Sequence, residues 1–184
     1  MSTTAVGLAL DDWAALALIG EGDAHGWSVV RAMAPGGDVG RVWVCSRARV
    51  YRALDALAAV GLVESAGVAS GGRGPARRVM SATPAGRRAI AEWLHAPVDH
   101  VRDLRSVLLL KLLFLSRARG DPSGLLRAQR ATLEPIEAGF TARLDAARGF
   151  ERTLVLWRLE SCRAALRFVD RLLSEPHVGR GAAR

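Results

Sequence analysis

The sequence has few residues of the kinds that form disulfides or bind metals. Its 184 residues include two cysteines, Cys45 and Cys162, and neither belongs to a CxxC pair. A disulfide framework and a zinc site are therefore not indicated, and we expect both cysteines to be small core side chains. His95, His100 and His177 also lack the spacing of metal ligands. We expect no metal and no cofactor.

Long apolar runs are missing as well. The strongest one, VLLLKLLFL at residues 107–115, is interrupted by Lys111 and is far shorter than the ~20 residues that span a bilayer. The N-terminus lacks the basic flank and apolar stretch of a signal peptide. The sequence therefore predicts a soluble, cytoplasmic protein without a membrane partner.

Motifs that mark common enzyme classes are also lacking. The chain contains no GxGxxG, P-loop, GxSxG or HExxH sequence. We therefore expect no enzymatic activity and no catalytic residues.

Positive charge, by contrast, is abundant and unevenly placed. The chain carries 26 Lys and Arg against 18 Asp and Glu, and Lys111 is its only lysine. Residues 41–88 hold nine arginines against Asp55 and Glu64, whereas residues 1–40 are net acidic. Such a concentrated basic block indicates a polyanion site, with a solvated basic face as the alternative.

The first part of the chain reads as three helices. Asp11 and Asp23 are candidate N-caps of the first two, and Trp27 is expected on the buried face of the second. Ser46 is a good N-cap for a third helix that ends at Gly61.

A hairpin and a fourth helix follow. Residues 62–68 and 77–82 are expected to form strands on either side of a flexible, glycine-rich turn at 69–76. Thr83 as N-cap and Pro84 at the first helical position then mark the start of another helix.

The rest of the chain, beyond a boundary at Pro97, predicts helices at about 102–119, 123–148 and 150–174. The last of these is apolar on two faces. A helix of this kind needs burial on two sides, so we infer a partner chain.

These elements predict a mainly α protein. We expect an N-terminal winged helix-turn-helix domain over residues 1–99, with three helices and a two-stranded β-wing, that binds double-stranded DNA. An all-helical dimerisation domain would cover residues 100–184, with a disordered end after about residue 175.

The DNA-binding side chains are expected on the third helix and the wing. Arg52 points away from the core side of the helix and can reach a base edge, with Arg49 as the alternative for this role, whereas the other side chains suit phosphate contacts. The predicted DNA-binding residues are Ser46, Arg47, Arg49, Tyr51, Arg52, Arg73, Arg77 and Arg78.

Trp13 and Trp157 lie on helices expected at the interface between subunits. The first interpretation is that they belong to the dimer core. The alternative is that they line an apolar pocket for a small, flat aromatic effector.

Three stretches together resemble the PadR family of transcriptional regulators: ALIGEGDAHGWSVVRAM, SRARVYRALDALAAVGLVES and GGRGPARRVMSATPAGRRAIAEWL. The likeness covers about residues 11–175, although the Lys-Tyr-Tyr-like run common on the family's second wing strand is replaced at 78–81. The resemblance implies a homodimeric repressor on a pseudo-palindromic operator, released by a small molecule. A MarR-type regulator and a winged-helix protein-interaction module without sequence-specific DNA binding are the alternatives.

Overall fold

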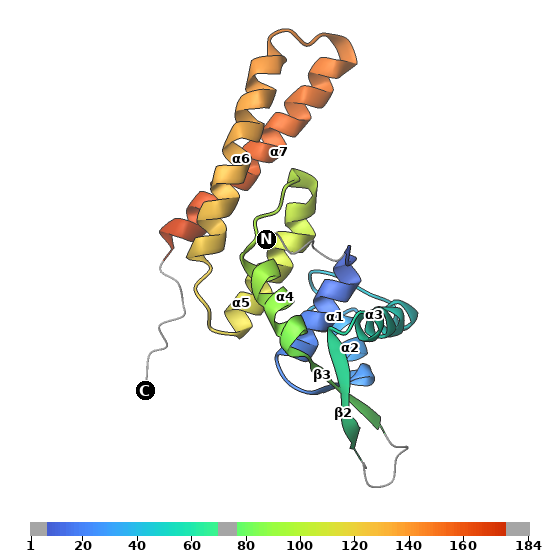
Figure 1. The fold of residues 1–184 in the computed structure, drawn as a ribbon. Helices are drawn as coiled ribbons and strands as arrows, with labels where there is room; N and C mark the ends of the chain where they lie inside the picture. Colours follow the sequence, from blue (N-terminus) through green and yellow to red (C-terminus); the bar gives the residue numbers. More distant parts are fainter. Residues whose placement is uncertain (1–6, 70–76, 176–184) are drawn as a thin grey trace. The chain divides into compact units, whose positions relative to one another are not determined.

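The computed structural model describes residues 7–69 and 77–175, drawn as coloured ribbon in Figure 1. The chain divides into two units, Met1–Leu94 and His95–Arg184. The predicted disordered end and Arg73 lie outside the described residues. No helix in the described part of the chain combines the length and apolar character needed to cross a membrane.

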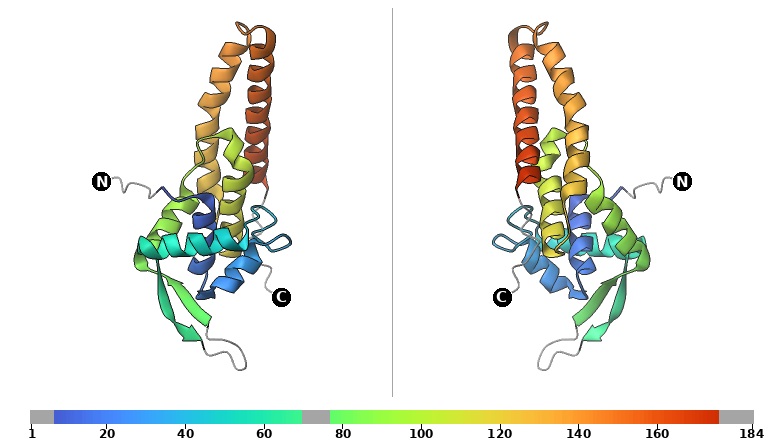
Figure 2. Two further views of the ribbon diagram at one scale, coloured as in Figure 1. Left: turned by 90° about the vertical axis from the view of Figure 1, so that its right-hand side faces the viewer. Right: turned by 90° about the vertical axis from the view of Figure 1, so that its left-hand side faces the viewer.

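Unit 1 is a winged helix, as the sequence predicts. Its helices are α1 (Leu10–Gly20), α2 (Gly26–Met33), α3 (Arg47–Ala59) and α4 (Pro84–His95), and its hairpin consists of β2 (Val63–Ala69) and β3 (Arg77–Ala82). α1 forms the centre of the core, since every residue from Ala14 to Ile19 is buried. α3 packs across α1, which leaves one side of α3 open to solvent (Figure 2).

The sheet contains one strand that the sequence did not predict. β1 (Ala24–His25) pairs antiparallel with β3, which gives the strand order β1-β3-β2. The pairing of β2 with β3 shifts register between Ser65 and Gly67, and Gly67 has a φ of +125° that glycine adopts without strain. The base of the wing is thereby joined to the segment that leads into α2.

Two helix starts and one helix end lie where the sequence predicts them. The hydroxyl of Ser46 accepts a hydrogen bond from the Arg49 amide at the start of α3, and Gly61 follows the helix with a φ of +71°. Thr83 Oγ1 accepts from the Gly86 amide at 3.0 Å and donates to the Gly61 carbonyl at 2.8 Å. This one side chain therefore caps α4 and ties it to the end of α3.

The predicted caps of α1 and α2 are wrong. α1 begins after Ala9, whose amide donates to the carboxylate of Asp12 at 2.8 Å, so Asp11 lies inside the first turn. α2 begins after His25 rather than at Asp23. Val29, Val30 and Met33 form the buried face of α2, and Trp27, in the first turn, lies to the side of that face and is 48% exposed instead of buried.

Unit 2 is entirely helical in its described part. It consists of η1 (Val101–Asp103), η2 (Leu104–Leu108), α5 (Leu109–Arg117), α6 (Ser123–Leu144) and α7 (Gly149–Ser174). The single helix expected at 102–119 is instead a 3₁₀ turn, a π-helical turn and a shorter α-helix. α6 and α7 run side by side in opposite directions (Figure 2).

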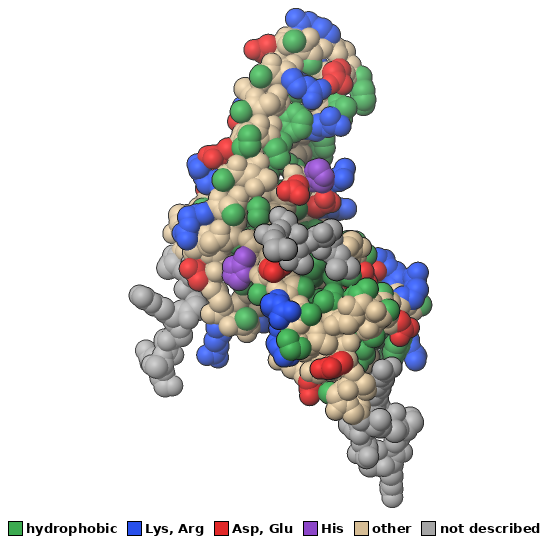
Figure 3. All heavy atoms as spheres, viewed as in Figure 1, with side chains coloured by type: hydrophobic (Ala, Val, Ile, Leu, Met, Phe, Trp, Pro, Cys, Tyr) green, Lys and Arg blue, Asp and Glu red, His purple; other side chains and the backbone are tan. Residues whose placement is uncertain are grey.

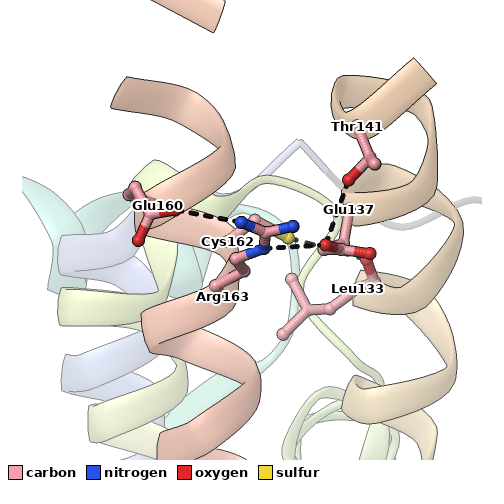
Figure 4. A network of polar contacts seen from close by, with 6 residues as sticks. All are labelled: Leu133, Glu137, Thr141, Glu160, Cys162 and Arg163. Atoms are coloured by element: carbon pink, nitrogen blue, oxygen red, sulfur yellow. Dashed lines mark hydrogen bonds and ion pairs between the residues drawn. The ribbon is translucent and has the colours of Figure 1, made fainter. Parts of the chain in front are cut away.

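Polar side chains join α6 to α7 beside their buried apolar seam (Figure 4). Arg163 of α7 donates to Glu137 of α6 at 2.9 Å and to Glu160 of its own helix at 3.1 Å. The Thr141 hydroxyl donates to the same Glu137 carboxylate. The thiol of buried Cys162 donates to the Leu133 carbonyl, and burial raises its pKa above the ordinary value.

Candidate nucleic-acid interface

The open side of α3 carries the predicted contact residues. Its inner side is formed by Val50, Ala53, Leu54 and Leu57, all buried. The predicted contact residues of this segment are all exposed: Ser46, Arg47, Arg49, Tyr51 and Arg52. Arginine side chains gather at the edge of unit 1 where α3 lies (Figure 3). The structure thus brings five of the predicted residues to the first two turns of one helix.

The ring of Tyr51 is held between α2 and an arginine. A Cβ atom on Gly26, the first residue of α2, would lie only 2.9 Å from the Tyr51 ring, so the glycine permits this close approach. The guanidinium of Arg47 lies 5.5 Å from the centre of the same ring, within cation–π range. The phenol is therefore fixed in place beside an exposed positive charge.

Arg49 is bound by a carboxylate from another helix. Asp11 of α1 receives the Arg49 Nε hydrogen bond at 2.6 Å, and its other oxygen accepts from Trp43 Nε1 at 2.7 Å. The Arg49 guanidinium also lies 5.9 Å from the Trp43 ring centre. The Asp11 side chain is 10% exposed and that of Arg49 is 45% exposed, so the anion is buried while the cation faces outward.

Sequence reasoning missed this cluster of Asp11, Trp43 and Arg49. An aspartate at the expected start of a helix is read as an N-cap, and nothing local shows that its partners lie 32 and 38 residues further on. The cluster joins α1, the segment before α3 and the first turn of α3. It therefore sets where the N-terminal end of α3 lies within unit 1.

Cys45 is buried next to the Asp11 carboxylate of this cluster. Burial raises the pKa of its thiol to about 11, and the neighbouring Asp11 carboxylate acts in the same direction. The positive charges of Arg49 and Arg52 lower it to a smaller extent. The thiol therefore stays neutral at physiological pH and adds no negative charge to the basic end of α3.

The wing continues the arginine-rich segment. The backbone of Arg77 pairs with Ala69 and that of Arg78 with Val68 in the β2–β3 ladder. The side chains of both arginines, like Arg73 as a whole, lie outside the described part of the structure. Their predicted DNA contacts stay predictions.

Trp13 and Trp157 lie in different units. Trp13 of α1 stacks on Trp93 of α4, with ring centres 5.3 Å apart and planes within 3° of parallel. Trp157 of α7 is 72% exposed. One face of the Trp13 ring is thus already covered within unit 1, whereas Trp157 presents most of its surface outward.

Comparison with known proteins gives one family match. Residues 15–92 match the model of the transcriptional regulator PadR-like family, a segment that runs from α1 into α4. No significant match is found among curated protein sequences.

Solved structures provide distant similarities. The Bacillus subtilis PadR complex with operator DNA shares 19% identity at a TM-score of 0.43, over 89% of this chain and 97% of that one. The smu.1604c protein of Streptococcus mutans UA159 shares 12% at 0.42, over 89% and 98%. The Vibrio cholerae virulence activator AphA shares 22% at 0.37, over 90% and 96%.

Proposed function

Residues 15–92 form a domain of the PadR-like family of transcriptional regulators, and on that premise we propose that this chain is a cytoplasmic, homodimeric repressor of a pseudo-palindromic operator. The exposed basic end of α3 supports the proposal most directly. It lies inside the matched segment and carries arginines on the one side of the helix that the core leaves open.

In this proposal α3 enters the major groove with its N-terminal turns foremost. The positive end of the helix dipole and the guanidinium of Arg47 attract phosphate there. The hydroxyl of Tyr51 donates a hydrogen bond to an oxygen of a second phosphate. Arg52, one turn further along and exposed, reaches a base edge, where an arginine can bind guanine through two hydrogen bonds. Arg49 adds a phosphate contact while Asp11 holds its Nε.

The wing arginines act differently. Arg73, Arg77 and Arg78 are proposed to contact the DNA backbone from the wing. Contacts of this kind add affinity but carry no sequence information by themselves.

The experiment that tests this function is selection of bound duplexes from a random pool, followed by titration of the selected operator and scrambled controls. Arg52→Ala should reduce discrimination between them by about 1–3 kcal/mol, whereas Arg73→Ala should weaken all duplexes about equally. Equal losses on every duplex for both variants would contradict the assigned roles. A pool without an enriched sequence would favour the protein-interaction module instead.

In this proposal each domain has its own role: residues 1–99 bind DNA and residues 100–184 dimerise. The outward side of α7 supports a partner, since Phe150 and Trp157 are 79% and 72% exposed and Phe168 is also exposed. Phe168 borders an apolar hollow of about 220 Å³ in unit 2, next to Leu104 and Leu108. A second copy of the chain would bury this surface.

Release by a small aromatic effector at Trp13 and Trp157 is the remaining part of the proposal. Tryptophan fluorescence, titrated with flat aromatic compounds that release the operator, tests it. Quenching that disappears in Trp157→Ala would support the site, and release of DNA without any change in fluorescence would count against it.

A further inference from the structure

The outward side of α3 carries an acidic side chain beside its basic ones. Asp55 lies in the third turn of the helix and is exposed, as Arg52 is. Residues 41–88 hold nine arginines, and Asp55 and Glu64 are their only acidic residues. The function proposed above gives Arg52 a contact with a base and leaves Asp55 without a role.

Helical spacing places Asp55 on the side of α3 that faces away from the core. The buried side of the helix is formed by Val50, Ala53, Leu54 and Leu57. At about 100° per residue, the direction opposite to this side falls between Arg52 and Asp55, which are about 60° apart around the helix. Three residues along the axis correspond to about 4.5 Å, close to the distance of about 3.4 Å between stacked base pairs. An α3 helix bound in the groove therefore presents the two side chains to neighbouring base pairs.

Neither of these two side chains is engaged within unit 1. Among the residues that the structure describes, none forms a hydrogen bond or an ion pair with the carboxylate of Asp55 or with the guanidinium of Arg52. The two groups also do not pair with each other, and a basic residue that precedes an acidic one is the less favourable order for an ion pair within a helix. Both groups are therefore available to an external partner.

A carboxylate on this side of α3 has a cost when DNA is bound. Each DNA strand carries one negative charge per about 3.4 Å, and basic proteins bind by neutralising these charges. An exposed acid on the side of α3 that enters the groove repels the phosphates of every duplex alike. A hydrogen bond to an N–H donor inside the groove offsets this repulsion, and only in duplexes that present the donor at the right base pair.

The chemistry of base edges decides which donor suits an aspartate. In the major groove, cytosine presents the N4 amine, whereas adenine presents its N6 amine beside the N7 acceptor. An ionised aspartate only accepts hydrogen bonds, so the N7 lone pair of adenine repels it and the edge of cytosine matches it. Arginine has the complementary chemistry, since it donates to both acceptors of guanine.

We propose that Asp55 is a specificity-determining residue that accepts a hydrogen bond from the N4 amine of a cytosine, on the base pair next to the guanine bound by Arg52. The proposal deepens the function argued above and rests on it. A thymine in place of this cytosine is rejected, because its O4 acceptor would face the carboxylate.

The test compares the duplex enriched by selection with a version in which this C·G pair is replaced by T·A. The pair is identified from the selection, as the cytosine next to the guanine at which Arg52→Ala loses its preference. The full-length proteins are the wild type, Asp55→Ala and the matched control Glu92→Ala. Glu92 is an exposed acid of α4, so its removal changes the net charge by the same amount and leaves α3 intact.

We expect the wild type and Glu92→Ala to bind the T·A duplex about tenfold more weakly than the selected one, a difference of about 1.4 kcal/mol. For Asp55→Ala the ratio should fall to about one, and binding of the T·A duplex should become tighter because the repulsion is removed. An acid that only adds charge to α3 would change the affinity for both duplexes by the same factor. The ratio therefore separates base recognition from charge.

Asp55→Asn provides a second measurement. Asparagine presents an acceptor and a donor together, the pattern that binds N6 and N7 of adenine. Selection with this variant should enrich adenine instead of cytosine at the same pair and leave the neighbouring guanine unchanged. Neither substitution at Asp55 removes a hydrogen bond or ion pair within the described part of the structure, so both variants should remain folded, which thermal denaturation checks.

A selected operator without a cytosine beside that guanine would overturn this inference, and so would an unchanged ratio in Asp55→Ala. Loss of preference at the guanine alone would do the same, because Asp55 would then act only by positioning Arg52. Each of these results leaves the proposed function intact. A wild type that enriches no sequence would overturn the proposed function and this inference with it.

Discussion

Asp11 is a buried carboxylate that holds two side chains at the N-terminal end of α3. It accepts hydrogen bonds from Arg49 and Trp43, which belong to different segments of unit 1. The positive charge of Arg49 compensates the negative charge of the buried Asp11 carboxylate. The carboxylate is shielded from solvent, whereas the guanidinium is partly exposed. The guanidinium of Arg49 is thereby held in position at the start of α3.

Asp11→Asn should weaken this arrangement. The amide can still accept from Trp43 but no longer carries the charge that attracts Arg49, so we expect a loss of about 1–2 kcal/mol in the free energy of unfolding. Operator affinity should fall as well, because the start of α3 is held less firmly. Chemical denaturation and anisotropy titration measure the two effects.

The control is the same change one residue further on. Asp12 accepts one hydrogen bond from the Ala9 amide, and an asparagine there can make the same contact. Asp12→Asn should therefore leave both quantities nearly unchanged. Equal effects of the two variants would show that Asp11 acts only as a negative charge in the first turn of α1, and not through its contacts with Arg49 and Trp43.

Lys111 predicts a particular dependence of stability on pH. Burial lowers its pKa from 10.5 to about 8, against a smaller opposite effect of Asp99. Between pH 8 and 10.5 the unfolded chain keeps a proton that the folded chain has released, so the free energy of unfolding should rise with pH, by about 3 kcal/mol at most.

Cys45 acts in the opposite direction at higher pH. Its pKa is raised from 9.0 to about 11, so above pH 9 the folded chain keeps a proton that the unfolded chain loses, and stability falls. The clean window for Lys111 is therefore pH 8–9. Denaturation curves across it should show the rise in the wild type and not in Lys111→Met; the same rise in both would exclude Lys111 as its source.

At the scale of elements, α4 depends on close contact with the segment between α3 and β2. A Cβ atom on Gly86 would collide with the Leu62 carbonyl oxygen, which is backbone and cannot turn away. Gly86→Ala should therefore push α4 outward and destabilise the protein by about 1–3 kcal/mol. Thermal denaturation measures the loss.

A glycine in α6 serves as the comparison. Gly139 lies inside that helix with no atom within 4 Å of an added Cβ. Gly139→Ala should stabilise the protein by about 0.5–1 kcal/mol, because alanine favours helix over glycine. Identical changes in stability for both substitutions would mean that the contact with Leu62 is not limiting.

The elements that the sequence predicted well are those with local signals. Ser46 and Thr83 have their capping partners within three residues, so the starts of α3 and α4 could be read directly. Asp11 looks the same in sequence but binds partners far along the chain, and β1 is too short to show a pattern. Residues 101–117 form a 3₁₀ turn, a π-helical turn and an α-helix in succession. The spacing of apolar residues is that of one continuous helix, so the sequence could not predict this division either.

For the proposed DNA-binding surface, the sequence predicted the outward residues of α3 because helical spacing decides which side chains face the core. It could not predict that Arg49 has a partner in α1, or that Tyr51 packs on Gly26, because both depend on how helices meet.

At the scale of the whole molecule, the proposed dimer would decide how strongly the chain binds DNA. One winged domain contacts one half-site, whereas a dimer makes the second contact intramolecular and gains affinity without new interactions. If the outer side of α7 is the interface, the exposed ring of Trp157 is its largest apolar contribution.

Trp157→Glu should therefore produce monomers, because a partner would have to bury a charge without a counter-ion. We expect the dimer dissociation constant to rise more than about a hundredfold, equivalent to about 2.7 kcal/mol. Sedimentation velocity over a range of concentrations measures it. Trp27→Glu, the same change at an exposed tryptophan of α2, is the control and should remain dimeric.

The two variants should also differ on DNA. Monomers of Trp157→Glu should bind an isolated half-site as well as the wild type does, since α3 is untouched, but should lose the added affinity for the full operator. A Trp157→Glu protein that stays dimeric would place the interface elsewhere, and one that loses the half-site too would mean that α7 supports the DNA-binding domain directly.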